Sequence, residues 1–276
     1  MKRNTSPLTR YLRSGHRRVA GWLEPGASEM IVAVASAQAR AGISGNVAEI
    51  GVHHGRLFIL LYLLSRPPEK AVAADLFSLQ HLNVDHSGEG DLAAFLRNMQ
   101  QHADTERLIV HEGDSMALDG AILTHLAGGS KFRLISIDGG HTREITMRDL
   151  ATAEAALAEG GVIILDDFFS EFFPEVAEGT FRYFVEAPRS IVPFAIGANK
   201  VLFCAPNRAE DYASALMGLT DKWAWRDFLG GHALCLNFEP LSFAERFGKL
   251  RLWQLVKHTG PLKLARAAYR ATFRAR

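Results

Sequence analysis

From residue 47 onward, short apolar runs rich in β-branched residues alternate with longer segments whose hydrophobic positions repeat at helical spacing. The apolar runs predict five strands, at residues 47–51, 71–76, 108–112, 134–138 and 162–166. The segments between them predict helices at residues 57–65, 91–102, around 117–126, and at 142–158. This alternation is typical of a parallel sheet wrapped by helices, and near-continuous apolar strands indicate that both faces of the sheet are covered.

The pattern changes after the fifth predicted strand, where two apolar runs follow one another closely. Residues 191–196 and Lys200–Cys204 are separated only by Gly197, Ala198 and Asn199. A connection this short can join antiparallel strands but not parallel ones, so we predict a hairpin at the end of the sheet. The predicted fold class is therefore α/β, with a Rossmann-like, doubly wound and mostly parallel sheet that ends in an antiparallel hairpin.

Composition fits one globular α/β domain with an extension at each end. The chain has 276 residues, 48% hydrophobic and 22% charged, and a chain of this length buries a large core without disulfides. Residues 1–45 predict a helical N-terminal extension, residues 46–206 the α/β domain, and residues 207–276 a basic helical C-terminal extension. Two cysteines, Cys204 and Cys235, fit a reducing compartment. The longest apolar run is too short to span a membrane and no secretory signal is visible, so we expect a cytoplasmic protein.

Charge is distributed unevenly along the chain, although the formal net charge is only +1. Residues 1–18 carry six basic residues and residues 246–276 carry nine, and neither segment contains an acidic residue. The central domain is therefore acidic and the two ends are basic. Hydrophobic positions at residues 262–273 approximate one face of a basic amphipathic helix. Such a helix either packs on the acidic domain or contacts an anionic surface or an acidic partner, and the sequence leaves both open.

Acidic residues follow the predicted strands at the points where an open α/β sheet binds its ligand. They are Glu49, Asp75, Asp114, Asp138, Asp166 and Asp167. The turn after the first strand contains Gly51 and Gly55, which let the backbone approach a ligand, but it has His53 where a dinucleotide fingerprint requires glycine. Asp75 follows Gly55 by 20 residues, at the place where a carboxylate can accept hydrogen bonds from both hydroxyls of a ribose.

Three of these carboxylates end neighbouring predicted strands and favour a metal site. Asp138, Asp166 and Asp167 would form an all-oxygen set that suits Mg²⁺, Mn²⁺ or Ca²⁺, whereas a bland interpretation makes one of them a cap and another a solvated side chain. Close carboxylates without a cation repel one another, which favours the metal. His141 is either a general base or a loop residue that bonds to the following helix.

Two further features of the sequence remain open. Residues 83–91 resemble a calcium loop in composition, but the twelfth position counted from Asp85 is Leu96 instead of the required Glu. This polar segment therefore caps the next helix or closes over a ligand. An aromatic group directly after Asp167 either belongs to the core or an interface, or lines a substrate cleft; it comprises Phe168, Phe169, Phe172 and Phe173.

Taken together, these motifs resemble the class I S-adenosylmethionine-dependent methyltransferases. The motifs are E-I-G-V-H-H-G at residues 49–55, Asp75, G-D-S at 113–115, I-D-G-G-H at 137–141, and G-G-x(4)-D-D at 160–167. Within that class the chain is most similar to the metal-dependent sugar O-methyltransferases of macrolide and aminocoumarin biosynthesis and their relatives in bacterial glycan pathways. The resemblance covers about residues 20–205.

The resemblance implies a seven-stranded sheet and a role for each motif. Glu49, Gly51 and Gly55 would hold the amino-acid end of S-adenosylmethionine, Asp75 its ribose, and Asp114 and Ser115 its adenine. Asp138, Asp166 and Asp167 would bind Mg²⁺ or Mn²⁺, and His141, with Asp138 beside it, would remove the proton from a hydroxyl of a sugar or glycoside-type acceptor. Relatives have an aromatic residue where this chain has Arg143, a difference that concerns the acceptor.

Other function classes remain open on the sequence alone. A nicotinamide-dependent oxidoreductase could use Asp75 in the same way, although the third glycine is missing and the hairpin is unexplained, and a non-catalytic binding module can share this fold. The basic ends favour an anionic acceptor, such as a phosphorylated or nucleotide-linked sugar. We expect a small-molecule acceptor and no nucleic acid as partner, and leave homo-oligomerisation open.

Overall fold

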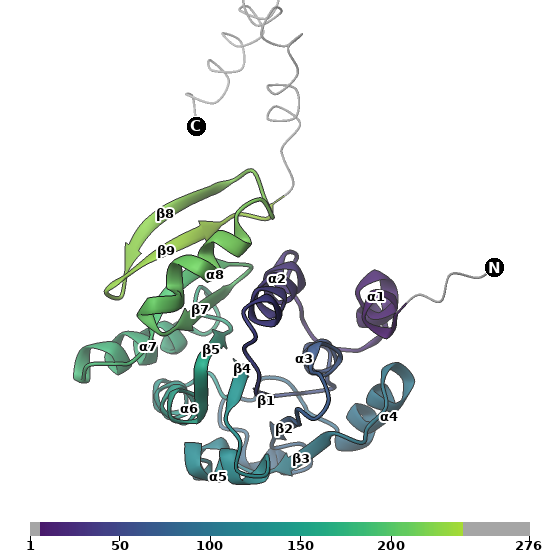
Figure 1. The fold of residues 1–276 in the computed structure, drawn as a ribbon. Coiled ribbons are helices and arrows are strands. Elements are labelled where there is room, and N and C mark those ends of the chain that lie inside the picture. Colours follow the sequence, from purple (N-terminus) through teal and green to yellow (C-terminus); the bar gives the residue numbers. More distant parts are fainter. Residues whose placement is uncertain (1–5, 240–276) are drawn as a thin grey trace, which may run out of the picture. The chain divides into compact units, whose positions relative to one another are not determined.

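A computed structural model describes residues 6–239, which form a single nine-stranded sheet with helices on both faces (Figure 1). The strand order is β3-β2-β1-β4-β5-β7-β6-β9-β8. The strands are β1 (Asn46–Ile50), β2 (Ala71–Asp75), β3 (Leu108–Glu112), β4 (Phe132–Ile137), β5 (Leu157–Leu165), β6 (Val192–Gly197), β7 (Lys200–Cys204), β8 (Trp223–Phe228) and β9 (Gly231–Leu236). Strands β1 to β5 are parallel to their neighbours in this group, as the alternating pattern predicted.

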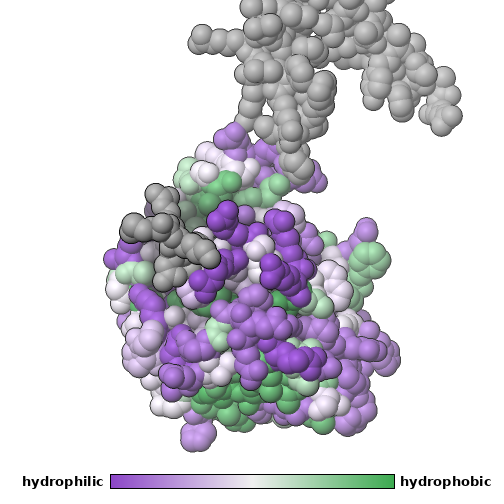
Figure 2. All heavy atoms as spheres, turned by 90° about the vertical axis from the view of Figure 1, so that its right-hand side faces the viewer, coloured by the Kyte–Doolittle hydropathy of each residue, from purple (hydrophilic) through white to green (hydrophobic). Residues whose placement is uncertain are grey.

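Helices cover the sheet because the strand side chains alternate between two apolar layers. In β1, Val47 packs into one buried cluster and Ala48 into the other. The longer helices are α2 (Ala27–Arg40), α3 (Phe58–Leu64), α4 (Leu92–His102), α5 (Gly120–Leu126), α6 (Arg143–Ala156), α7 (Pro174–Glu186) and α8 (Ala209–Leu216). The first cluster includes residues of α2, α3, α4 and α8, and the second includes residues of α5, α6 and α7. The face that carries α1 (Pro7–Arg10) and α4 is mostly hydrophilic outside (Figure 2).

Helix starts follow from short polar side chains that satisfy free backbone N–H groups. Asp91 accepts a hydrogen bond from the Ala94 N–H at the start of α4, Asp119 caps α5 in the same way, and Thr142 caps α6. These caps place the beginnings of the helices beside the carboxyl ends of the strands. Among the described helices, none combines the length and the apolar character needed to cross a membrane.

The predicted hairpin is confirmed. Ala198 and Asn199 both have positive φ, 51° and 61°, which gives a two-residue turn whose twist suits an antiparallel pair. Gly197 pairs with Lys200 at the closed end, and β7 then pairs antiparallel with β5. The turn therefore brings Asn199 and Lys200 to the same edge of the sheet as the ends of β1, β4 and β5.

The prediction of seven strands is wrong, because one more hairpin brings the number in the described sheet to nine. The prediction of a wholly helical C-terminal extension is wrong for the same reason. After α8, residues 223–236 form β8 and β9, and β9 continues the sheet by pairing parallel with β6. Leu229 and Gly230 supply the positive φ values of the connecting turn. The weak alternation of β8 concealed this hairpin, because its side chains are half-buried or exposed. The amphipathic segment at 262–273 lies outside the described residues.

Candidate active site

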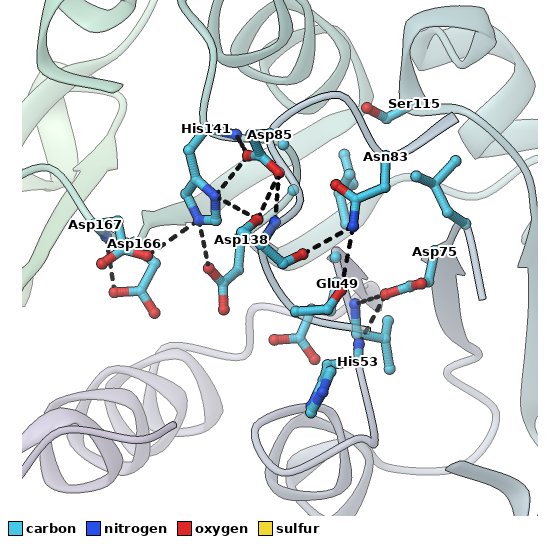
Figure 3. Close-up of a pocket in the computed structure, with 18 of the residues that line it drawn as sticks. Glu49, His53, Asp75, Asn83, Asp85, Ser115, Asp138, His141, Asp166 and Asp167 are labelled. Atoms are coloured by element: carbon cyan, nitrogen blue, oxygen red, sulfur yellow. Dashed lines mark hydrogen bonds and ion pairs between the residues drawn. The ribbon is translucent and has the colours of Figure 1, made fainter. Parts of the chain in front are cut away.

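A cavity of about 550 Å³ lies at the carboxyl ends of strands β1 to β5, as predicted for an open α/β sheet (Figure 3). Its floor consists of the strand ends and the turns that follow them. Residues 20–24, from the N-terminal segment, and residues 80–88, from the loop after β2, complete the lining. Two exposed aromatic side chains also line it, Trp22 (74% exposed) and Phe172 (81% exposed). The cavity is thus formed by segments far apart in the sequence.

Glu49 is the buried acid at the end of β1. Its side chain is 2% exposed, and among the described residues its Oε2 atom has no hydrogen-bond partner. Burial raises the pKa of Glu49 well above its usual range, and the nearby charge of Asp138 adds to the effect. Gly51 follows with φ 83°, and a Cβ there would lie 1.8 Å from the carbonyl oxygen of Asp138. A larger residue at position 51 would therefore push the β1 and β4 turns apart.

Asp75, at the end of β2, organises the first turn. Its Oδ2 accepts hydrogen bonds from the backbone N–H groups of Val52 (2.6 Å) and His53 (2.7 Å), and its Oδ1 accepts one from Phe77 (2.7 Å). These bonds help to hold His53 at φ 52°, a conformation that glycine adopts more readily. The predicted ribose acid therefore also shapes the turn beneath the cofactor position.

The end of β3 contributes the third part of the lining. Asp114 accepts a hydrogen bond from the Met116 N–H at 2.9 Å, and Ser115 begins the short helical turn that follows. Both residues line the cavity, together with Gly113 and His111, and the adenine role that the resemblance implies for them stays a prediction. The sequence analysis missed His111 because it lies inside the strand and not after it.

Lys200 divides the three carboxylates that the sequence grouped together. Its ammonium group forms an ion pair with Asp166 and is 2% exposed. Burial alone would lower the pKa of Lys200, but Asp166 and Asp138 outweigh that effect and raise it. Asp167 has φ 56° and its Oδ1 accepts a hydrogen bond from Asn199 at 2.7 Å. Lys200 therefore already supplies a positive charge to these carboxylates, a partner that the acidic motifs alone did not predict.

The remaining two carboxylates converge on His141. One side-chain ligand atom each from Asp138, His141 and Asp167 lie within 4.8 Å of one another. The Nε2 atom of His141 is 3.1 Å from Asp167 Oδ2 and 3.8 Å from Asp138 Oδ1. Burial and the charge of Asp166 raise the pKa of Asp138 to about 6. Burial would lower the pKa of His141, but hydrogen bonds with Asp138, Asp167 and Asp85 raise it to about 11.

The structure also settles the surroundings of His141. The helix after it is capped by Thr142, and the ring of His141 contacts Asp85, Asp138 and Asp167. The role of His141 as a base stays a prediction. Phe173 stacks on the imidazole, with ring centroids 3.8 Å apart. Of the other three aromatics, Phe168 is buried in the core and Phe169 and Phe172 are exposed. Arg143 points to Glu144 and to Glu178 of α7.

Comparison with known proteins agrees with this arrangement. Residues 48–168 match the family model of a methyltransferase domain. The fold is similar to the O-methyltransferase NovP (TM-score 0.51, 14% identity, 65% of this chain and 80% of that chain) and to an O-methyltransferase from Bacillus cereus in complex with SAH (0.50, 16%, 74% and 91%). It is also similar to cofactor-bound Rv0187 from MTB (0.50, 18%, 74% and 92%). No curated protein matches the chain in sequence.

The sheet order and the cavity at the carboxyl ends of the strands are those of a Rossmann-like fold. The family model matches residues 48–168 of this chain as a methyltransferase domain, in agreement with the resemblance of the motifs.

Proposed function

We propose that this protein transfers the methyl group of S-adenosylmethionine to a hydroxyl of a sugar or glycoside-type small molecule, with the help of a divalent cation. One observation carries the proposal: His141 and two carboxylates face the same cavity as Glu49, whose buried Oε2 atom has no hydrogen-bond partner among the described residues. A methyl donor and an oxygen acceptor could therefore meet there in line. The similarity in fold to the O-methyltransferase NovP supports an oxygen acceptor.

The cofactor would occupy the part of the cavity next to β1, β2 and β3. Glu49 would accept hydrogen bonds from the ammonium group of the cofactor's amino-acid end, which would satisfy its free Oε2 atom. Gly51 and Gly55 leave space for the backbone to approach that end, and Asp75 stands at the ribose position. Asp114 and Ser115 would line the adenine position.

The acceptor would occupy the part of the cavity next to β4 and β5. Asp138 and Asp167 offer hard oxygen ligands that fit Mg²⁺ or Mn²⁺. The buried Nε2 atom of His141 has no hydrogen bond of good geometry among the described residues, which leaves it for the acceptor and not for the ion. Asp166 completes the predicted set if Lys200 releases it. When bound, the ion would orient a diol and lower the pKa of its hydroxyl. An ion on Asp138 and Asp167 would also neutralise two of the charges that raise the pKa of His141, so that its Nε2 atom could take the proton.

The basic residues near both ends favour an anionic acceptor, and the relevant test compares free, phosphorylated and nucleotide-linked sugars at two salt concentrations.

The free thiols of Cys204 and Cys235 support the further proposal of a reducing, cytoplasmic location.

The first experiment measures the melting temperature with S-adenosylhomocysteine and with NAD, each with Mg²⁺ and with EDTA. A ligand at 100 times its dissociation constant adds about 2.7 kcal/mol, a shift of several degrees for a domain of this size. We expect a shift with S-adenosylhomocysteine and none with NAD. A shift with NAD alone would instead favour the oxidoreductase.

Methyl transfer to an acceptor panel then separates an enzyme from a binding module. We expect EDTA and Asp167→Asn to reduce the transfer rate at least tenfold, while the exposed Glu171→Gln has no effect. Undiminished transfer in EDTA-treated Asp167→Asn would exclude the metal part of the proposal.

A further inference from the structure

The loop between β2 and α4 reaches across the cavity and contacts His141. Asp85 Oδ2 accepts a hydrogen bond from the His141 backbone N–H at 2.6 Å and lies 2.9 Å from the ring atom Nδ1. The Oγ atom of Ser87 is also 2.9 Å from Nδ1. Both side chains come from 54 or more residues before His141, and Figure 3 shows Asp85 directly beside the imidazole. The sequence alone predicts that residues 83–91 cap the next helix or close over a ligand.

These contacts determine which ring nitrogen carries a hydrogen. The carboxylate of Asp85 can only accept hydrogen bonds, and the Ser87 hydroxyl donates its hydrogen to Asp85 Oδ1 at 2.7 Å. The Nδ1 atom of His141 is therefore the donor to both. This leaves Nε2 as the ring atom that faces Asp138 and Asp167. The side chains of Asp85 (13% exposed) and His141 (12% exposed) are both shielded, so water competes little for this bond.

We propose that Asp85 is the positioning residue of His141: it holds the imidazole with its hydrogen on Nδ1 and turns Nε2 toward the acceptor. The proposal rests on the proposed function for the role of His141, but the orientation of the ring does not. A carboxylate on the far nitrogen fixes both the tautomer and the ring plane, and Phe173 packs against the ring face. The loop after β2 thereby belongs to the reaction centre and not only to the lining of the cavity.

Asp85→Ala is the sharpest test, because one carboxylate oxygen, Oδ2, accepts from both the backbone N–H and the Nδ1 atom of His141. An asparagine can keep its carbonyl oxygen at this position and accept both bonds, so the side chain must be removed to break the contact. We expect the Nδ1 proton of His141, seen by ¹H–¹⁵N NMR in the full-length protein, to disappear in Asp85→Ala. Glu89→Ala is the matched control, since it removes a carboxylate from an exposed position of the same loop and should preserve the signal. An unchanged Nδ1 proton in Asp85→Ala would overturn the proposal.

Kinetics on an acceptor found by the panel give the second readout. We expect Asp85→Ala to lower kcat by at least about 100-fold while the dissociation constant of S-adenosylhomocysteine stays within twofold. Combined with His141→Ala, the same substitution should cost nothing more, because a positioning residue acts through the ring it holds. A further tenfold loss in the double variant would assign Asp85 a separate role and contradict the proposal.

The proposed function and the positioning role of Asp85 can be disproved separately. If the wild type methylates no acceptor, the proposed function fails, and the NMR signal of Nδ1 still decides whether Asp85 positions the ring. If Asp85→Ala unfolds the loop, Ser87→Ala provides the second variant: it removes one of the two acceptors but leaves Asp85, so we expect the Nδ1 proton to remain and to exchange faster with water. Loss of that proton in Ser87→Ala with Asp85 intact would also overturn the proposal.

Discussion

Two buried clusters of charged side chains lie at opposite ends of the same strands, and they differ in how completely their polar atoms are satisfied. The amino-end cluster consists of Gln38, Glu69 and Arg133. Every guanidinium nitrogen of Arg133 donates a hydrogen bond: Nε and Nη2 to Glu69, Nη1 to Gln38, and Nη2 also to the Leu64 carbonyl. Glu69 in turn accepts from the backbone N–H groups of Gly45 and Arg66.

The carboxyl-end cluster consists of Glu49, Asp138, Asp166, Asp167 and Lys200, with His141 beside it. Within residues 6–239, one lysine faces four carboxylates here, and both Glu49 Oε2 and His141 Nε2 lack a hydrogen bond of good geometry. The pKa values of one buried glutamate in each cluster shift in opposite directions. Burial would raise the pKa of Glu69, yet its hydrogen bonds outweigh burial and lower it, whereas burial raises the pKa of Glu49.

This comparison separates structural charge from functional charge. Buried ionic groups stabilise a fold only when their hydrogen-bonding capacity is filled, and unfilled groups destabilise it. The hydrogen-bonding capacity of the amino-end cluster is filled, and its bonds join α2 to the starts of β2 and β4. That of the carboxyl-end cluster is not, which is expected where a ligand supplies the missing partners.

The largest expected effect is the loss of the cation in the filled cluster. Arg133→Met leaves the buried carboxylate of Glu69 without its main partner, which costs about 3–5 kcal/mol of unfolding free energy. Urea unfolding measures it, and neither Mg²⁺ nor S-adenosylhomocysteine should compensate specifically. The exposed Arg66→Met variant retains the Arg133 pair and serves as the control. A loss below 1 kcal/mol would mean that this cluster is not structural.

Lys200→Met should cost less, about 1–3 kcal/mol, because the carboxylates that it leaves face the cavity and can take up water or protons. Freed from Lys200, Asp166 becomes available as a cation ligand. We therefore expect Mg²⁺ to bind more tightly than in the wild type and to restore up to about 2.7 kcal/mol at 100 times its dissociation constant. Calorimetric titration with Mg²⁺ measures the affinity, and an unchanged affinity would show that Lys200 does not compete with the ion.

Glu49→Gln should change stability by no more than about 1 kcal/mol near pH 5, but its effect should depend on pH. Because the pKa of Glu49 is raised in the folded protein, the wild type loses stability as pH rises from 4.5 toward that pKa, by up to about 1.4 kcal/mol per pH unit. Glutamine does not titrate, so the variant gains on the wild type as pH increases. Parallel curves of unfolding free energy against pH would contradict the raised pKa.

The smallest effect concerns the mouth of the cavity. Trp22→Ala removes a side chain that is 74% exposed, so unfolding free energy should change by less than about 0.5 kcal/mol. Trp22 nevertheless lines the cavity, and we expect S-adenosylhomocysteine to protect it from acrylamide quenching. Quenching that is identical with and without the ligand in the wild type would place Trp22 outside the binding region.

Sequence reasoning succeeded where the signal is local. Strands β1 to β7 came from short apolar runs, and the antiparallel hairpin came from a connection too short for any other topology. The position of the acids after the strands followed from the general rule for open α/β sheets. It failed at β8 and β9, because a half-exposed hairpin at the end of a sheet lacks a clear apolar pattern.

The sequence by itself therefore determined the positions of the first seven strands along the chain, the edge of the sheet at which the acids gather, and the methyltransferase resemblance of the motifs. Only the tertiary structure decided how those acids are partnered. Lys200 lies 34 residues from Asp166 and Asp85 lies 56 residues from His141. The first contact depends on the antiparallel pairing of β7 with β5, and the second on the loop that crosses the cavity after β2. No periodicity records such a contact, because the charge that a buried group meets is set by the packing of distant segments.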